Sequence, residues 1–127
     1  MDVKNPVIVW LDVRINDSSN QSIANIIKTK YPNTLLQEGS DLNETIRFIQ
    51  RITSKEISVI VIVSGHLGEE LTKQIHDNPH VLSINVFCGN KARAEMWGNH
   101  FRKVRMIMII CIKYKYSAFR VLYNIIG

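Results

Sequence analysis

Three residue types that together perform acyl transfer stand near the ends of two predicted strands. Asp12 follows the apolar run Val7–Leu11, and Ser64 and His66 follow the β-branched run 59–63. A hydroxyl, an imidazole and a carboxylate form a nucleophilic triad when the imidazole bonds both partners. The turn lacks the Gly-x-Ser-x-Gly pattern that exposes a nucleophilic serine. We therefore predict that the three residues are not a triad and that the chain is not an enzyme.

The glycines of the same turn suggest a second kind of site, in which backbone N–H groups at a helix start hold a phosphate. Gly65 and Gly68 have no recognised phosphate-binding spacing. We place the helix start at Glu69, where Glu69 and Glu70 would complement the helix dipole and repel an anion, each effect being worth about 0.3 to 1 kcal/mol. Binding of a small ligand or nucleotide at this turn is kept as an alternative.

Metal coordination and phosphotransfer are not expected. Mg²⁺ prefers several oxygen ligands, and Asp12 is the one carboxylate predicted at this position. The four histidines are scattered, without a paired cysteine or a Glu-x-x-His spacing. Ser64 stands where a phosphoacceptor aspartate would be needed, and serine does not form an acyl phosphate. We predict neither a metal nor a cofactor.

Alternating strands and helices are expected to position these residues. The run Val59–Val63 has no polar alternation, which is typical of a central parallel strand. Further strands are predicted at 7–13, 34–37, 81–88 and 106–112, each followed by a helix. Asp41 and Glu44 have the spacing of a capping box before the second helix. The apolar positions at helical spacing are Ile23, Ile26, Ile27 and Tyr31, then Leu42, Ile46, Ile49 and Ile52, then Leu67, Leu71 and Ile75, then Ala94, Trp97 and Phe101, and last Phe119, Leu122, Tyr123 and Ile126.

Five strand–helix repeats predict an α/β fold, a three-layer, doubly wound five-stranded parallel sheet of order 2-1-3-4-5 that is flavodoxin-like or receiver-like. The 127 residues are expected to form one domain, in which 104–127 supply the fifth strand and helix. In this strand order a crevice lies at the carboxyl ends of the first and third strands. The residues predicted to line it are Asp12, Arg14, Ser64, Gly65 and His66.

The positive charge of the chain lies in its last third. Residues 1–90 hold eight Lys/Arg against ten Asp/Glu, whereas residues 91–127 hold eight against one. We predict a basic interaction face for a protein partner or a downstream domain. Exposed aromatic residues are not interleaved with these charges, so nucleic acid is not the expected partner. The residues of this face are Lys91, Arg93, Arg102 and Lys103.

Cysteine use and the N-terminal sequence favour a cytoplasmic protein. Cys88 and Cys111 lie in apolar, strand-like runs and are expected to be free thiols in a reducing compartment. Met1–Pro6 is polar, and the apolar run after it is too short for a signal peptide. Met106–Ile112 is too short to cross a bilayer and is followed by charged residues, so we predict no transmembrane segment.

A larger set of residues agrees with a known kind of module. The set comprises Trp10-Leu11-Asp12, Ile62-Val63-Ser64-Gly65-His66-Leu67-Gly68, Ile75-His76, Ile84-Asn85-Val86-Phe87-Cys88, Lys91 and Glu95-Met96-Trp97. Together they resemble a receiver-like N-terminal module of large multidomain invertebrate proteins, in which it precedes an arginine-specific mono-ADP-ribosyltransferase domain or an array of tetratricopeptide repeats. The resemblance covers roughly Val7 to Val104 and implies a regulatory or docking role without catalytic residues. Beyond Lys103 the chain departs from the pattern, and 104–127 is either native sequence or an aberrant, truncated or mis-spliced tail.

We therefore expect a non-catalytic, receiver-like regulatory or protein-interaction module that lacks the phosphoacceptor aspartate. One alternative is a small-ligand or nucleotide-binding domain at the crevice after the first and third strands. Another, implied by the resemblance, is an accessory domain of an NAD-arginine ADP-ribosyltransferase whose catalytic part lies outside this chain.

Overall fold

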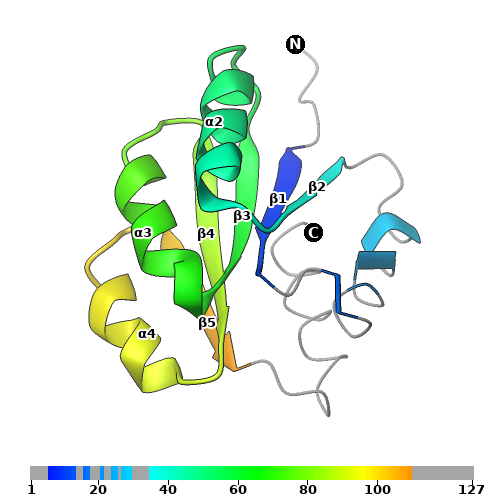
Figure 1. Cartoon of the computed structure of the whole chain (residues 1–127). Helices are drawn as coiled ribbons and strands as arrows, with labels where there is room; N and C mark the ends of the chain where they lie inside the picture. The colour runs from blue at the N-terminus through cyan, green and yellow to red at the C-terminus, as the bar shows by residue number, and fades with distance from the viewer. Residues whose placement is uncertain are drawn as a thin grey trace.

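A five-stranded parallel sheet of order β2-β1-β3-β4-β5 forms the centre of the molecule (Figure 1). The computed structural model of the chain describes residues 6–13, 16, 17, 21, 24, 25, 27–29 and 35–109. The strands are β1 (Val7–Leu11), β2 (Leu36–Gly39), β3 (Val59–Ser64), β4 (Val81–Cys88) and β5 (Val104–Ile109). The predicted α/β, flavodoxin-like fold and its strand order are confirmed.

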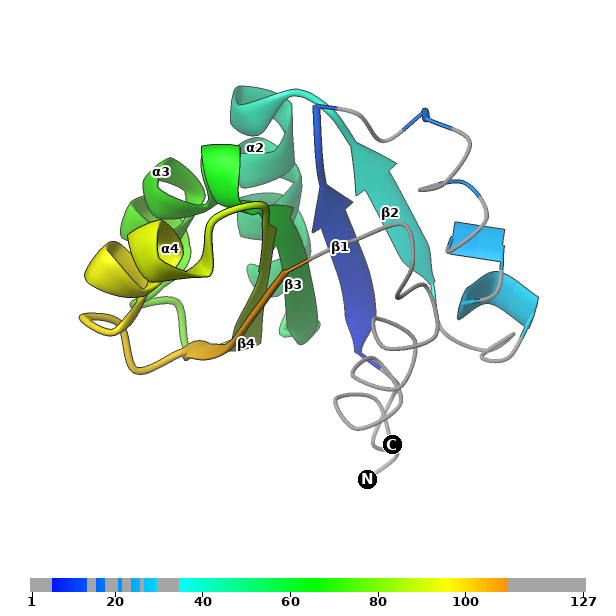
Figure 2. The same ribbon diagram turned by 90° about the horizontal axis from the view of Figure 1, so that it is seen from below.

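Three helices, α2 (Leu42–Thr53), α3 (Gly65–Ile75) and α4 (Lys91–Gly98), cover one face of the sheet. Residues 21, 24, 25 and 27–29 are also helical and lie beside β2, on the side away from α2 (Figure 2). Helices on both sides of a parallel sheet are what crossover connections of one hand produce. This arrangement brings the carboxyl ends of the strands to a common edge of the sheet.

The two faces of the sheet explain why β3 is apolar along its length. Alternate side chains of a strand point to opposite faces, and both faces of this sheet are buried. Toward the three helices point Val9, Leu11, Val61 and Val63, which cluster with Ile49, Leu71 and Ile75. On the other face Ile8, Trp10, Ile60 and Ile62 are at most 5% exposed.

The capping signal of the second helix is confirmed. Asp41 is the N-cap of α2, and its carboxylate accepts a hydrogen bond of 2.9 Å from the backbone N–H of Glu44. Such a bond satisfies one of the N–H groups that a helix start leaves without an internal partner. The predicted second strand is shifted by about two positions, because β2 is Leu36–Gly39.

The predicted start of the third helix is wrong. α3 begins at Gly65 and not at Glu69, so its first turn holds no acidic residue. Ser64 is the N-cap, with extended backbone and no side-chain hydrogen bond to the helix. Glu69 lies one turn later and pairs with Lys73 at 3.8 Å. The sequence carried no capping pattern that would mark the true start, because this cap does not use its hydroxyl.

The fifth strand is present, and it lies in the part of the chain that departs from the resemblance. β5 pairs with β4 in parallel, from Ile84↔Val104 to Cys88↔Ile109. The predicted fifth helix, with Phe119, Leu122, Tyr123 and Ile126, lies outside the described residues, as do Arg14 and Cys111. Within the described ranges no helix has the length and apolar character needed to cross a membrane.

Candidate functional site

The predicted crevice residues lie at the carboxyl edge of the sheet. Leu11 pairs with Val63, so Asp12 and Ser64 follow neighbouring strands at the same level. Asp12 is 8% exposed, and its backbone N–H donates to the Gly39 carbonyl at 3.0 Å, which joins the end of β1 to β2. The structure thus brings Asp12, Ser64 and Gly65 to one edge.

The three candidate triad residues are not arranged for acyl transfer. The Ser64 hydroxyl is buried and has no hydrogen-bond partner among the described residues. His66 is exposed in the first turn of α3. A serine nucleophile needs a hydrogen-bonded base within reach, and here the hydroxyl has none. The geometry gives no support to nucleophilic catalysis.

Close packing explains the two glycines of α3. A Cβ on Gly65 would lie 2.6 Å from Cβ of Cys88, and a Cβ on Gly68 would lie 2.9 Å from the ring carbons Cη2 and Cζ2 of Trp97. Real Cβ atoms do not approach so closely, so each glycine permits a contact that alanine would obstruct. Gly65 allows the start of α3 to approach β4, and Gly68 allows α3 to approach α4. These contacts account for the glycine-rich turn without a bound phosphate.

The thiol of Cys88, next to this turn, is shifted toward its protonated, less reactive form. Burial raises the pKa of Cys88, although the Asn90 backbone N–H and the charge of Lys91 act in the opposite direction. A raised thiol pKa keeps the group protonated at neutral pH, and the thiolate is the reactive form. Cys88 therefore packs against Gly65 as a small apolar side chain.

A hollow of about 70 Å³ lies elsewhere, between β2 and the first turns of α2. Its apolar lining comes from Val9 and Phe48, and Glu38, Asp41 and Glu44 supply acidic groups. Of the predicted crevice residues that the structure describes, Asp12, Ser64, Gly65 and His66, none lines it. The sequence analysis missed this hollow, because nothing in the spacing of its residues indicates that an edge strand and a helix leave space between them.

The four residues of the predicted basic face lie at the start of α4 and after its end. Lys91 and Arg93 lie in the first turn of α4, whereas Arg102 and Lys103 follow the helix. The side chain of Lys103 donates to the backbone carbonyl of Asn78. Burial lowers the Lys103 pKa, and the charge of Asp77 opposes that shift. Lys103 is thus engaged in joining two loops.

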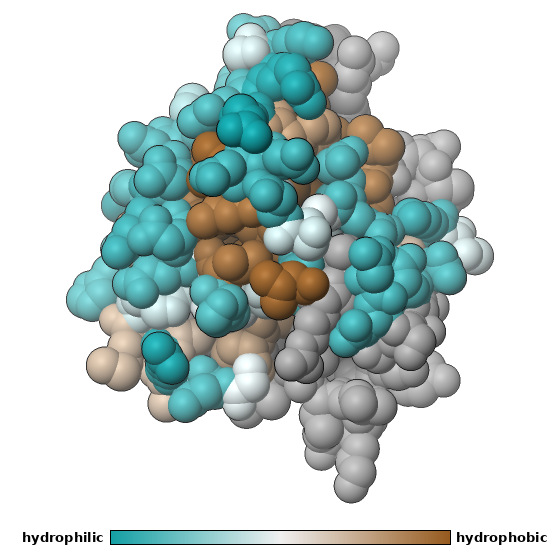
Figure 3. Space-filling view, viewed as in Figure 1, coloured by the Kyte–Doolittle hydropathy of each residue, from teal (hydrophilic) through white to brown (hydrophobic). Residues whose placement is uncertain are grey.

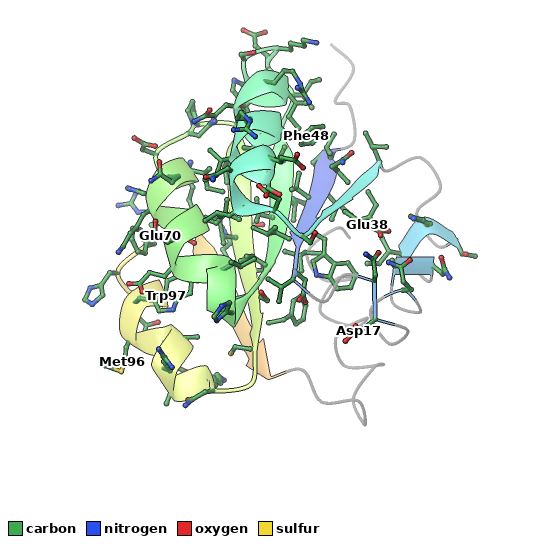
Figure 4. All side chains as sticks on the ribbon, in the orientation of Figure 1. Asp17, Glu38, Phe48, Glu70, Met96 and Trp97 are labelled. Atoms are coloured by element: carbon green, nitrogen blue, oxygen red, sulfur yellow. The ribbon has the colours of Figure 1, made fainter. Side chains whose placement is uncertain are left out.

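The outer surface of α4 carries an apolar side chain that the sequence analysis did not select. Met96 is 76% exposed and points away from the fold (Figure 4). Ala94 is buried and Trp97 packs against the core, which leaves Met96 on the solvent side of the helix. The helical spacing of Ala94 and Trp97 could have predicted that Met96 lies on the outer side of the helix. In Figure 3 the outer surfaces of α2 and α3 are mostly hydrophilic, with an apolar strip between them.

Neither a metal centre nor a relative identifies the protein. The described ranges hold no group of three or more His, Cys, Asp or Glu side chains that would bind a metal ion. Comparison of the chain with protein-family models, with characterised proteins and with solved structures gave no match. The resemblance to a receiver-like module therefore stays a hypothesis, while the flavodoxin-like fold rests on the sheet itself.

Proposed function

We propose that this chain is a non-catalytic, receiver-like module of the cytoplasm that binds another protein through the outer surface of α4. The observation that carries the proposal is Met96, 76% exposed, on the same helix as the exposed side chains of Lys91 and Arg93. Methionine and arginine are enriched in protein interfaces, and a thioether adapts its shape to a partner. The expected partner surface is acidic around an apolar centre.

The residues at the end of β3 support the expectation that this chain does not carry out phosphotransfer. Ser64 offers a hydroxyl in place of a carboxylate, and Asp12 is a single carboxylate for a cation that prefers several oxygen ligands. We expect no increase in the intact mass of the chain after incubation with Mg²⁺ and acetyl phosphate. A stable phosphoryl adduct would contradict a non-catalytic module.

Docking through α4 is tested by affinity capture with matched variants. The immobilised chain is exposed to an extract of its own cells, and the retained proteins are quantified. Met96→Asp and Arg93→Glu should lose a protein that the wild type retains. Leu82→Asp is the control, because Leu82 is 46% exposed on β4 and receives the same charge. Equal retention by all four chains would remove α4 from consideration.

A small ligand at the crevice is the second candidate. It is favoured by the buried Ser64 hydroxyl, which has no partner in the described part of the chain, and by a first turn of α3 without acidic residues. Titration with ADP-ribose, followed by backbone amide signals, tests it. Asp12→Ala and His66→Ala should abolish binding and leave the melting temperature nearly unchanged; a large loss of stability would make the two residues structural.

The accessory role implied by the resemblance is a third proposal. It is tested by sequencing the mature transcript across the codons for Lys103 to Met106. A splice junction that leads into a transferase or repeat domain supports the proposal and makes the remaining codons intronic. A continuous message that ends after Gly127 contradicts it.

A further inference from the structure

Strand β2 lies at an edge of the sheet, where one side of its backbone faces away from β1. The N–H group of Ile8 donates to the carbonyl of Leu35, and that of Asp12 donates to the carbonyl of Gly39. The backbone groups of Leu35 and Gly39 therefore face β1. In a parallel ladder alternate residues face the same way, which directs the backbone groups of Leu36 and Glu38 outward. No residue of the described part bonds those outward groups. Such an edge is a template for a further strand.

The hollow described above lies directly beside this edge. Val9 and Phe48 give it an apolar lining, and Asp41 and Glu44 add carboxylates from the start of α2. Among the described residues no lysine or arginine lines it, and the guanidinium carbon of Arg51 lies 5.5 Å from the centre of the Phe48 ring. The third acidic residue, Glu38, is already neutralised by Lys28 at 2.9 Å. The negative charge left for a ligand is therefore concentrated at Asp41 and Glu44, and Glu44 is exposed.

The edge also presents apolar surface to solvent. Leu35 is 59% exposed just before β2, and Gln37 is exposed in the middle of the strand. In the register of the sheet Gln37 pairs with Val9, so its side chain lies on the face that carries α2. A strand added next to β2 would alternate its side chains in the same manner, with every second one directed toward the hollow.

We propose that the β2 edge is a second docking surface, which takes an extended segment of a partner protein that carries lysine or arginine at alternate positions. In strand addition the main-chain hydrogen bonds supply affinity, and pockets for alternate side chains supply specificity. Here the outward groups of β2 supply the bonds, and the acidic hollow selects a cationic side chain. The surface is separate from α4, so the proposal does not depend on the function proposed above.

Short peptides of defined pattern test this surface. The first alternates lysine and valine, and the second alternates glutamate and valine. The third repeats the first with an N-methyl group on every residue, which removes the N–H donors of both edges of the peptide. We expect the first peptide to bind and to shift the amide signals of Gln37, Gly39 and Glu44. The second and the third should bind more weakly by about tenfold or more. Equal binding of the N-methylated peptide would overturn strand addition.

A pair of charge-reversal variants locates the contact. Glu44→Lys should weaken binding of the lysine–valine peptide by about tenfold or more. Glu70→Lys changes the net charge equally on the exposed surface of α3, and it should leave the affinity unchanged within about twofold. Circular dichroism checks that both variants are folded. The proposal is wrong if no binding occurs up to about 1 mM peptide, if Glu44→Lys binds like the wild type, or if the shifted signals lie on α4.

Discussion

The carboxyl edge of β1 and β3 and the outer surface of α4 are built in opposite ways. At the carboxyl edge Asp12 is 8% exposed, the Ser64 hydroxyl is buried, and Gly65 admits Cys88 at a distance that leaves no space for a Cβ. On α4 the apolar side chain of Met96 is 76% exposed. Open α/β sheets place ligands at the carboxyl edge, and in this chain Asp12, Ser64 and Gly65 are buried or closely packed at that edge. The accessible chemistry lies on a helix surface.

The largest expected effect concerns the packed edge. Gly65→Ala places a Cβ 2.6 Å from that of Cys88, and overpacking of this kind lowers the free energy of unfolding by about 1 to 3 kcal/mol. Helix propensity alone predicts the opposite sign, a gain of up to about 1 kcal/mol. Gly89→Ala is the control, because no atom of the described residues lies within 4 Å of its added Cβ. Urea unfolding of both variants decides; a Gly65→Ala variant as stable as the wild type would show that the edge is open after all.

The second prediction compares two buried threonines, one with a hydrogen-bonded hydroxyl and one without. The Thr53 hydroxyl donates to the Ile49 carbonyl at 2.6 Å and accepts from the Asn78 amide at 2.8 Å. Thr53→Val should therefore cost about 1 to 3 kcal/mol. The Thr72 hydroxyl is fully buried and has no partner among the described residues. Thr72→Val should be neutral or stabilising by about 1 kcal/mol. In thermal unfolding we expect Thr53→Val to lower the stability and Thr72→Val to leave it unchanged or raise it. Equal losses of stability in the two variants would contradict the hydrogen-bond assignment.

A smaller effect comes from the ion pair at β2. Burial raises the pKa of Glu38, but hydrogen bonds from Lys28 and Gln21 and the charge of Lys28 outweigh it, and the net pKa lies below 4.5. A lowered carboxyl pKa gives stability that is present above the unfolded pKa and is lost as the pH falls through the folded pKa. Since Lys28 is half exposed, the loss should be under about 1 kcal/mol. Lys28→Met should reduce this acid dependence in melting curves between pH 6 and pH 3; an unchanged dependence would contradict the pairing.

The smallest effect on stability belongs to α4. Met96→Asp removes an exposed side chain, and surface substitutions of this type change the free energy of unfolding by no more than about 0.5 kcal/mol. The same variant should nevertheless lose the bound protein. A loss of stability above about 1 kcal/mol would show that Met96 is part of the packing, and the contrast between the two regions would fail.

The fold was accessible from the sequence because several local signals agree. The apolar run of β3, the Asp41 cap and the strand 81–88 all predicted elements that the structure contains. The start of α3 was missed because Ser64 caps it without a side-chain bond. A contact such as Gly65 with Cys88 depends on the approach of two elements from separate parts of the chain, which residue spacing does not determine.

The sites were less accessible than the fold. Of the four basic residues predicted to form one face, two lie at the start of α4 and two after its end, and Lys103 bonds the Asn78 carbonyl. Their role as an interaction face stays a prediction. The crevice positions Asp12, Ser64 and Gly65 were placed correctly at one edge of the sheet, since strand order determines that edge. What remains a prediction is their role, because ligand binding depends on open space and unpaired groups and not on strand order.

The most direct test is to record the amide signals of the ¹⁵N-labelled chain in an extract of its own cells. Exchange between the free and the bound state broadens the signals of the contact surface more than those of the rest of the chain, so the method locates a contact before the partner is known. Our account predicts broadening over α4 that disappears in Met96→Asp and persists in Leu82→Asp, with the signals of Asp12, Ser64 and His66 unaffected. Broadening at the carboxyl edge instead of α4, or none at all, would contradict it.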